Sequence, residues 1–342
     1  MGLSTHPGVT GKPASLLYDS RMNHATRVYD SVLEMLPNEE NPSPLVRINA
    51  LNPAPGFDLF AKLEWMNPFG SVKDRAAAAL IAQLESEGKL TAARGLVEPT
   101  SGNTGISLAA IASMKGYSMR AIVPNKVPDE KKVLLKIAGA DVDVINDAMC
   151  PSPGMGEGSI GIAKSYAKAR PERYVMPNQY ENRANSEAHV RTTGPEIWRQ
   201  TGGNVTHLFT SLGTCGTVTG CATYLKSKNP DIKVFAVQPS EGHDVPGLRN
   251  TSELHVSKLF DPALIDEILE IDFEKAYTTA LELCRREGLF AGPSSGLIFE
   301  GARNVLGRQP IPNAGCGVMI FCDSVFKYVS SMTKHIPELA PE

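Results

Sequence analysis

Short apolar runs alternate with helical patterns along the chain from Pro44 onward. The runs predict strands over residues 57–66, 95–100, 119–124, 140–146, 206–213, 233–239 and 317–323. Helices are predicted over residues 74–88, 105–116 and 130–139, each with a glycine at its end, and over a further segment that ends at Lys228. This alternation is typical of an α/β protein with a mostly parallel sheet.

Residues 1–42 differ from the rest of the chain. They mix Pro, Gly, Asn and Glu around one weakly periodic stretch, Val28 to Leu36. We interpret them as an N-terminal arm that wraps on the body of the protein or on a partner subunit.

Composition narrows the class of protein. The 342 residues carry a net charge of -3 without a basic run, which argues against nucleic-acid binding. No apolar stretch is long enough for a transmembrane helix, and the N-terminus lacks the apolar core of a signal peptide, so we expect a cytoplasmic protein. The six cysteines form no C-x-x-C pair and have no histidines at zinc-finger spacing, which predicts free thiols and no metal site.

Three glycine-rich segments hold the candidate chemistry. TSGNTG (100–105) and SLGTCGTVTG (211–220) each lie where a predicted strand leads into a predicted helix, and AGPSSG (291–296) follows a helix ending in CRREG. In α/β sheets, ligands bind at the carboxyl ends of strands, where helix N-termini favour anions. The first segment suits a carboxylate and the second a phosphate. A helix cap, a tight turn and a helix exit are the structural alternatives for the three segments.

Lys73 lies in the segment NPFGSVKDRA, immediately before the predicted helix that begins at Asp74. The positive end of the helix dipole disfavours the ammonium form of a lysine at this position. A lysine tuned in this way can form a Schiff base. The alternative is a solvated lysine on the first helical turn.

Six segments in their order and spacing resemble the cysteine synthase and cystathionine β-synthase family of fold-type II pyridoxal-5′-phosphate (PLP) enzymes. The segments are NPFGSVKDR, EPTSGNTG, NQYENRANSEAH, TTGPEIW, GTCGTVTG and AGPSSG. The resemblance runs from about Pro44 to about Ser330, where DSVFKYVS is similar to the family's closing D-S-G-x-x-Y-x-S.

The resemblance implies a two-lobed α/β fold like that of the tryptophan synthase β-subunit, with mostly parallel twisted sheets flanked by helices and PLP between the lobes. The smaller, mobile lobe would span residues 76–179 and carry the loop for the substrate carboxylate. The larger, PLP-binding lobe would combine residues 43–75 and 180–330, which leaves 331–342 as a tail.

The resemblance also implies roles for the matching positions. Lys73 is the implied Schiff-base lysine and general base, Asn103 the partner of the PLP phenolic oxygen, and Ser294 the residue facing the pyridine nitrogen. The implied phosphate site consists of Gly213, Thr214, Cys215, Gly216 and Thr217. The implied site for the substrate α-carboxylate consists of Thr100, Ser101, Thr104 and Gln179.

The implied reaction is a β-replacement through an α-aminoacrylate that forms L-cysteine from O-acetylserine or O-phosphoserine and sulfide. Arg249, in HDVPGLRN, matches an arginine that faces the substrate phosphate in relatives that use O-phosphoserine. An arginine suits a phosphate dianion through paired hydrogen bonds, and an ordinary surface arginine is the alternative.

Three alternative functions share the same fold. A cystathionine β-synthase would use serine and homocysteine, but residues 1–42 offer no cysteine to ligate a haem and the sequence given leaves no room for a C-terminal regulatory domain. A serine or threonine dehydratase is disfavoured by the TSGNTG and TTGPEIW matches. A non-catalytic relative would be expected to lack Lys73.

Several positions depart from the family pattern. Cys215 stands where the family usually has glycine, and Phe69 and Pro293 replace a small and an aliphatic residue. Tyr180, Arg183 and Ser186 also differ. No catalytic group is lost, so the departures bear on the substrate more than on the reaction type.

The family also sets expectations for partners. Its members are usually homodimers that act on small-molecule amino-acid and sulfur substrates, and some dock the C-terminal tail of serine acetyltransferase in the active-site cleft.

Overall fold

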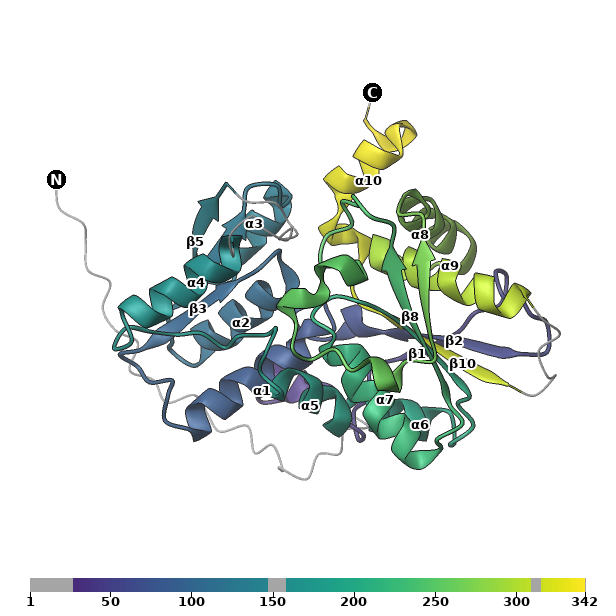
Figure 1. The fold of residues 1–342 in the computed structure, drawn as a ribbon, viewed down its shortest axis with the longest axis horizontal. Helices are drawn as coiled ribbons and strands as arrows, with labels where there is room; N and C mark the ends of the chain where they lie inside the picture. Colours follow the sequence, from purple (N-terminus) through teal and green to yellow (C-terminus); the bar gives the residue numbers. More distant parts are fainter. Residues whose placement is uncertain (1–26, 147–157, 309–314, 342) are drawn as a thin grey trace.

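The computed structural model describes residues 27–146, 158–308 and 315–341, which form two sheets lying side by side (Figure 1). The larger sheet has the order β1-β2-β10-β7-β8-β9 and the smaller one the order β5-β4-β3-β6. The larger sheet comprises β1 (Leu45–Arg47), β2 (Asp58–Leu63), β7 (His207–Ser211), β8 (Lys233–Pro239), β9 (Glu267–Ile271) and β10 (Cys316–Phe321). The smaller sheet comprises β3 (Gly95–Pro99), β4 (Met119–Pro124), β5 (Ala140–Ile145) and β6 (Tyr174–Val175). All strand pairs are parallel except β1 with β2.

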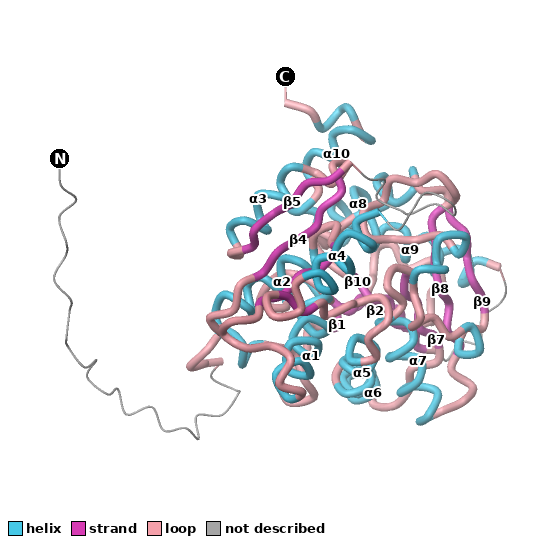
Figure 2. The backbone as a smooth tube through the Cα atoms, turned by 60° about the vertical axis from the view of Figure 1, so that its left-hand side comes forward, coloured by secondary structure: helices cyan, strands magenta, loops and turns pink. Residues whose placement is uncertain are grey.

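Helices cover both faces of the sheets (Figure 2). The helices are α1 (Lys73–Ser86), α2 (Asn103–Met114), α3 (Asp129–Ile137), α4 (Gly158–Ala169), α5 (Ala184–Arg191), α6 (Thr193–Gln200), α7 (Gly216–Lys228), α8 (Glu274–Glu287), α9 (Pro293–Gly307) and α10 (Val329–His335). Short 3-10 helices span Val32–Met35, Glu64–Met66, Thr251–Val256, Pro262–Leu264, Val325–Lys327 and Pro337–Leu339. None of the helices in the described part of the chain is both long and apolar enough to cross a membrane.

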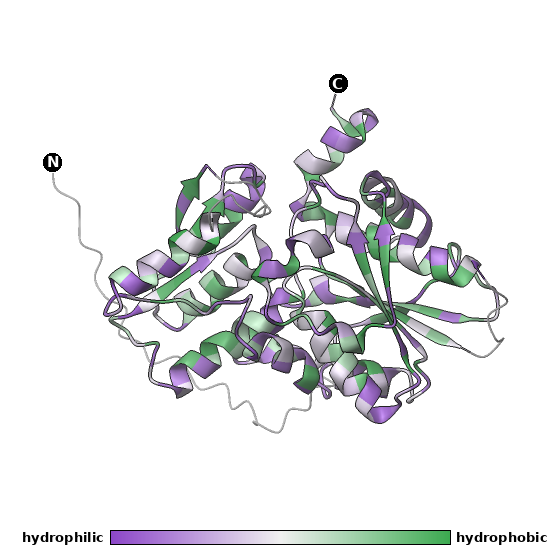
Figure 3. Cartoon of the chain, viewed as in Figure 1, coloured by the Kyte–Doolittle hydropathy of each residue, from purple (hydrophilic) through white to green (hydrophobic). Residues whose placement is uncertain are grey.

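Strand alternation explains the layers of the larger lobe. In β10, Val318 and Ile320 pack in the core shared with α6 and α7, whereas Met319 and Phe321 pack in the core shared with α8 and α9. A strand that is apolar on both faces must be covered on both, and the central strands β7, β8 and β10 of the larger sheet are accordingly mostly hydrophobic (Figure 3). In the smaller lobe, Leu96 packs toward α1 and α2, and its neighbour Val97 packs toward α4.

The hydrophobic pattern predicted most of the strands and some of the helices. All seven predicted strands are present, and the helices predicted over 74–88, 105–116 and 130–139 are confirmed as α1, α2 and α3. Their terminal glycines, Gly88, Gly116 and Gly139, have φ of +64°, +79° and +97°, a backbone conformation in which glycine carries no steric penalty. The pattern did not predict β1, β6 or β9.

The described part of the predicted arm lies against the body. Leu33 packs on the core formed by α1 and α2, the Pro37 carbonyl accepts a hydrogen bond from Arg75, and the Glu39 carbonyl accepts one from Arg199. The arm's residues 1–26 lie outside the described residues.

Candidate active site

One pocket between the two sheets collects the side chains that the sequence singled out. Twelve of the thirteen predicted site residues line it: Lys73, Thr100, Ser101, Asn103, Thr104, Gln179, Gly213, Thr214, Cys215, Thr217, Arg249 and Ser294. Gly216 is not among the residues that line the pocket. The TSGNTG loop follows β3 into α2, and the segment 212–215 follows β7 into α7, so both leave the carboxyl end of a parallel strand.

Lys73 is the first residue of α1, and the turn before it is held from several sides. Gly70 has φ of +78°, and its carbonyl accepts a 2.9 Å hydrogen bond from Lys327 Nζ. The Asp74 carboxyl accepts hydrogen bonds from the Phe69 N–H and the Ser107 hydroxyl, and burial raises the pKa of Asp74 to about 6. These contacts fix the backbone from which the Lys73 side chain enters the pocket.

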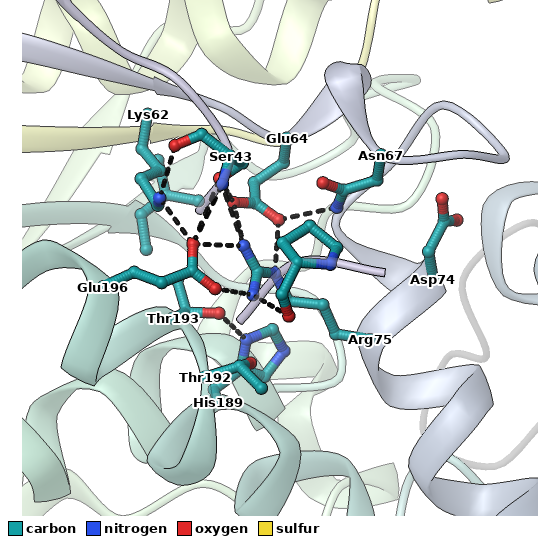
Figure 4. A network of polar contacts seen from close by, with 12 residues as sticks. Ser43, Lys62, Glu64, Asn67, Asp74, Arg75, His189, Thr192, Thr193 and Glu196 are labelled. Atoms are coloured by element: carbon teal, nitrogen blue, oxygen red, sulfur yellow. Dashed lines mark hydrogen bonds and ion pairs between the residues drawn. The ribbon is translucent and has the colours of Figure 1, made fainter. Parts of the chain in front are cut away.

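A buried ion cluster surrounds Arg75, in the first turn of α1 (Figure 4). The Arg75 guanidinium donates to both Glu64 and Glu196, and Lys62 Nζ donates to Glu196 at 2.7 Å. Two cations and two carboxylates balance in charge, and all four residues are less than 5% exposed. Because α1, α6 and β2 each supply a member, the cluster ties the turn bearing Lys73 to the larger lobe.

The TSGNTG loop wraps around the start of α2. The Thr100 hydroxyl accepts hydrogen bonds from the N–H groups of Gly102 and Gly105, and the Thr104 hydroxyl donates to Gln179 Oε1 at 2.5 Å. The fully buried Glu98 carboxyl accepts hydrogen bonds from the backbone N–H groups of Asn178 and Gln179. Burial raises the pKa of Glu98 to about 7. Glu98 therefore holds the backbone that carries the Gln179 side chain into the pocket.

The segment Gly213–Thr217, here called the GTCGT loop, forms the opposite wall. A Cβ on Gly213 would lie 2.8 Å from the Gly247 carbonyl oxygen, so only glycine fits there. Cys215 adopts φ of +65°, a left-handed conformation that explains why relatives use glycine at this position. Burial raises the pKa of the Cys215 thiol to about 12, so the thiol stays protonated and serves as a packing group. The described cysteines are unpaired, and Cys150 lies outside the described residues.

Ser294 reaches the pocket from the first turn of α9 and is 5% exposed. Pro293 is the first residue of that helix, where a missing N–H has no intrahelical partner to lose. This explains how the helix accepts proline in place of an aliphatic residue.

Asp323, Tyr328, Lys131 and Tyr180 are among the pocket residues that were not predicted as site residues. Asp323 accepts 2.6 Å hydrogen bonds from Asn103 Nδ2 and from the Tyr328 hydroxyl. Lys131, in the first turn of α3, is 2% exposed, and its amine lies 3.9 Å from the centre of the Tyr328 ring. Burial lowers the pKa of Lys131 to about 8. Tyr180 accepts a 3.1 Å hydrogen bond from Arg249 Nη2. The DSVFKYVS match was the one sequence signal that pointed to Asp323 and Tyr328.

The donor set of the pocket fits PLP. The positive ends of α2, α7 and α9 meet there, which favours an anionic ligand. The hydroxyls of Thr214 and Thr217 and the backbone N–H groups of the GTCGT loop suit a phosphate, and the Lys73 amine lines the same pocket as an aldehyde partner.

Comparisons with known proteins agree with this fit. A family model described as "Pyridoxal-phosphate dependent enzyme" matches residues 36–323. Cysteine synthase B of Salmonella typhimurium is 38% identical over 289 residues, which cover 84% of this chain and 92% of that protein. A probable cysteine synthase of Bacillus subtilis is 40% identical over 264 residues, which cover 74% of this chain and 83% of that protein.

Solved structures show the same architecture. A hydrogen sulfide-producing enzyme from Fusobacterium nucleatum has a TM-score of 0.80 at 30% identity, covering 88% of this chain and all of the other. O-ureido-L-serine synthase has a TM-score of 0.79 at 28% identity, covering 89% of this chain and 94% of the other. The chain therefore belongs to the cysteine synthase family of pyridoxal-phosphate dependent enzymes.

Proposed function

We propose that this protein forms L-cysteine by β-replacement, taking the amino-acid skeleton from O-acetylserine or O-phosphoserine and the sulfur from sulfide. The observation that carries the proposal is a shared pocket. The Lys73 amine, the TSGNTG loop and the GTCGT loop face one another there. These elements supply a covalent anchor, a carboxylate site and a phosphate site within reach of a single small ligand.

PLP, when bound, supplies the electron sink that makes the α-proton of the amino acid acidic. Lys73 Nζ would hold the cofactor and, as a free amine, would take the proton from the donor Cα and later return it. Thr100, Ser101 and Thr104 hold the α-carboxylate with Gln179, and Asn103 holds the cofactor's phenolic oxygen. Ser294 would face the pyridine nitrogen, and a neutral hydroxyl there would leave that nitrogen unprotonated, which would favour elimination over transamination.

Arg249 supports O-phosphoserine as a donor. It lines the pocket, is 6% exposed and lies 5.2 Å above the Tyr180 ring, so its guanidinium is held in place before a ligand arrives. A held guanidinium binds a phosphate dianion through paired hydrogen bonds at a small entropic cost.

We also propose the family's homodimer and a smaller lobe, residues 76–179, that moves on the substrate carboxylate. Closure would exclude water from the reacting carbon. Size measurement of the purified protein in solution tests the dimer.

Absorption spectroscopy of the PLP-loaded enzyme tests the reaction. The visible band of the bound cofactor should change when the preferred donor is added and return when sulfide follows, with L-cysteine as product. O-acetylserine, O-phosphoserine and serine are added separately, and homocysteine replaces sulfide in a parallel set. Turnover of serine with homocysteine alone would assign a cystathionine synthase instead. The Lys73→Ala variant should bind PLP without the covalent band and form no product.

A further inference from the structure

Helix α5 lies directly behind the GTCGT loop and touches both of its threonines. Asn185 Nδ2 donates to Thr214 Oγ1 at 3.0 Å, and His189 Nε2 lies 3.2 Å from Thr217 Oγ1. Asn185 and His189 are four residues apart on one helix face. Both are at most 1% exposed, so these contacts have no competition from bulk water.

Two glycines on α7 allow this close approach. A Cβ on Gly216 would lie 2.1 Å from Asn185 Oδ1, and one on Gly220 would lie 2.2 Å from the Ser186 carbonyl oxygen. Glycine at position 216 therefore leaves room for the Asn185 side chain.

The direction of the bond to Thr214 follows from counting hydrogens. Asn185 Nδ2 also donates to the Gln179 carbonyl oxygen at 2.8 Å, and a carbonyl can only accept. The same nitrogen therefore donates its other hydrogen to Thr214 Oγ1. The Thr214 hydroxyl hydrogen is not used in this bond and can point into the pocket.

His189 presents a choice of two tautomers. Burial lowers the pKa of His189 to about 3, so the ring is neutral and carries a single N–H. Its Nδ1 lies 2.9 Å from Thr193 Oγ1 (Figure 4). If Nε2 carries the hydrogen, it donates to Thr217 and Nδ1 accepts from Thr193. If Nδ1 carries the hydrogen, the Thr217 hydroxyl must donate its own hydrogen to Nε2.

A phosphate dianion can only accept hydrogen bonds, so a bound cofactor needs both hydroxyls as donors. We propose that Asn185 and His189 are positioning residues, which donate to Thr214 and Thr217 so that both hydroxyl hydrogens are aimed at the cofactor phosphate. Phosphate binding thereby selects the Nε2–H tautomer of His189 and orders the chain Thr193–His189–Thr217. This inference rests on the phosphate site proposed above.

A double-mutant cycle on the dissociation constant of PLP tests whether His189 acts on the phosphate through Thr217. Apoproteins of wild type, His189→Leu, Thr217→Val and the double variant are titrated with PLP, and the ³¹P resonance of the bound phosphate is recorded. Each single variant should weaken PLP binding about tenfold, and the double variant should be no weaker than Thr217→Val alone. His189→Gln keeps an amide N–H near the position of Nε2 and should recover most of the affinity and the wild-type ³¹P shift.

Thr193→Val covers the case in which His189→Leu does not fold. It removes the hydroxyl that donates to Nδ1 and should weaken PLP binding several-fold. Thr192→Val is its matched control, because the Thr192 hydroxyl donates to the Ala188 carbonyl whereas Thr193 is the hydroxyl that bonds His189, and it should leave binding unchanged.

If the two single losses of PLP affinity multiply in the double variant, to about a hundredfold, His189 acts on the fold and not through Thr217, and the proposal is wrong. Unchanged PLP affinity in Thr217→Val would also contradict the proposal, because it would mean that the phosphate does not bind to this loop. The second result would also contradict the site assignment, whereas the first would leave that assignment and the proposed reaction intact.

Discussion

The side-chain amide of Asn103 donates a 2.6 Å hydrogen bond to the carboxylate of Asp323 and so joins the start of α2 to the segment that follows β10. Lys327 Nζ donates to Asn103 Oδ1 at 3.2 Å, which fixes the orientation of the amide. One amide hydrogen of Asn103 is then left for a ligand. The contact therefore aims Asn103 at the place proposed for the cofactor's phenolic oxygen.

Replacing Asp323 with Asn should let the side-chain amide of Asn103 rotate. The neutral amide can donate as well as accept, so Asn103 loses its fixed acceptor and can rotate. We expect the visible absorption maximum of the bound cofactor to shift and turnover to fall about tenfold. The Ser324→Ala variant, next along the chain, removes a hydroxyl bonded to the Phe290 carbonyl and should change neither. A wild-type spectrum in Asp323→Asn would contradict the role of this pair.

Lys131 places a second amine in the pocket beside the TSGNTG loop, where its side chain leaves no room for a Cβ on Gly102. A cation here should stabilise the substrate carboxylate. Lys131→Met should raise the KM for the amino-acid donor about tenfold with little change in kcat. In wild type the KM should also rise above about pH 8, because the ammonium loses its proton there. Lys132→Met is the control, since Lys132 bonds Asp129 and the Asn125 carbonyl outside the pocket. An unchanged KM in Lys131→Met would mean that Lys131 only packs on Tyr328 and does not bind the substrate carboxylate.

Arg249→Ala should separate the two candidate donors. It should lower kcat/KM for O-phosphoserine at least about tenfold and leave O-acetylserine nearly unaffected, because only the former carries a phosphate dianion. Steady-state kinetics with each donor and sulfide measure this. Arg183→Ala, at an exposed position, is the matched control. Equal losses for both donors would assign Arg249 to general pocket structure.

Arg75→Met should be strongly destabilising, by about 3–5 kcal/mol, because it leaves two buried carboxylates with only Lys62 to balance them. Urea denaturation of the apoprotein measures the loss. Arg191→Met removes an exposed pair with Glu187 and should cost less than about 0.5 kcal/mol. A small loss in Arg75→Met would mean that water or a rearranged Lys62 reaches the cluster.

Glu98 should make stability fall as pH rises through the acid range. Its folded pKa of about 7 lies above the ordinary value of 4.5, so the folded chain keeps a proton that the unfolded chain has released. The resulting stabilisation is complete below pH 4.5 and lost by about pH 7. Relative to wild type, Glu98→Gln should therefore gain about 3 kcal/mol between pH 5 and 8. Urea denaturation across this range measures the difference, and parallel profiles of the two proteins would contradict it.

Apolar runs and helical patterns predicted most of the longer strands, together with the helices α1, α2, α3 and α7. They missed β9, a sheet edge in which Glu267, Ile268 and Glu270 face outward or are only partly covered, so its sequence EILEI shows no continuous apolar run. They also missed α5, whose conformation depends on packing against α1 and α7 more than on a hydrophobic stripe.

The candidate site divides in the same way. Lys73, the TSGNTG loop and the GTCGT loop were found because their glycines and hydroxyls stand at strand–helix junctions. Lys131 gives no such signal, because it sits in a charged run that resembles any exposed helix start. Its burial arises only when α3 packs beside Tyr328, nearly two hundred positions later in the chain.

The position of β10 has a consequence for how the protein is made. This strand is the shared neighbour of β2 and β7, yet it is the last strand of the larger sheet to be synthesised. Asp323 and Tyr328, which complete the pocket wall, follow it. A nascent chain therefore carries Lys73 long before it can form the cavity around it, and coenzyme uptake must wait until the ribosome has released β10. Capture of the coenzyme thus follows the insertion of β10 between β2 and β7.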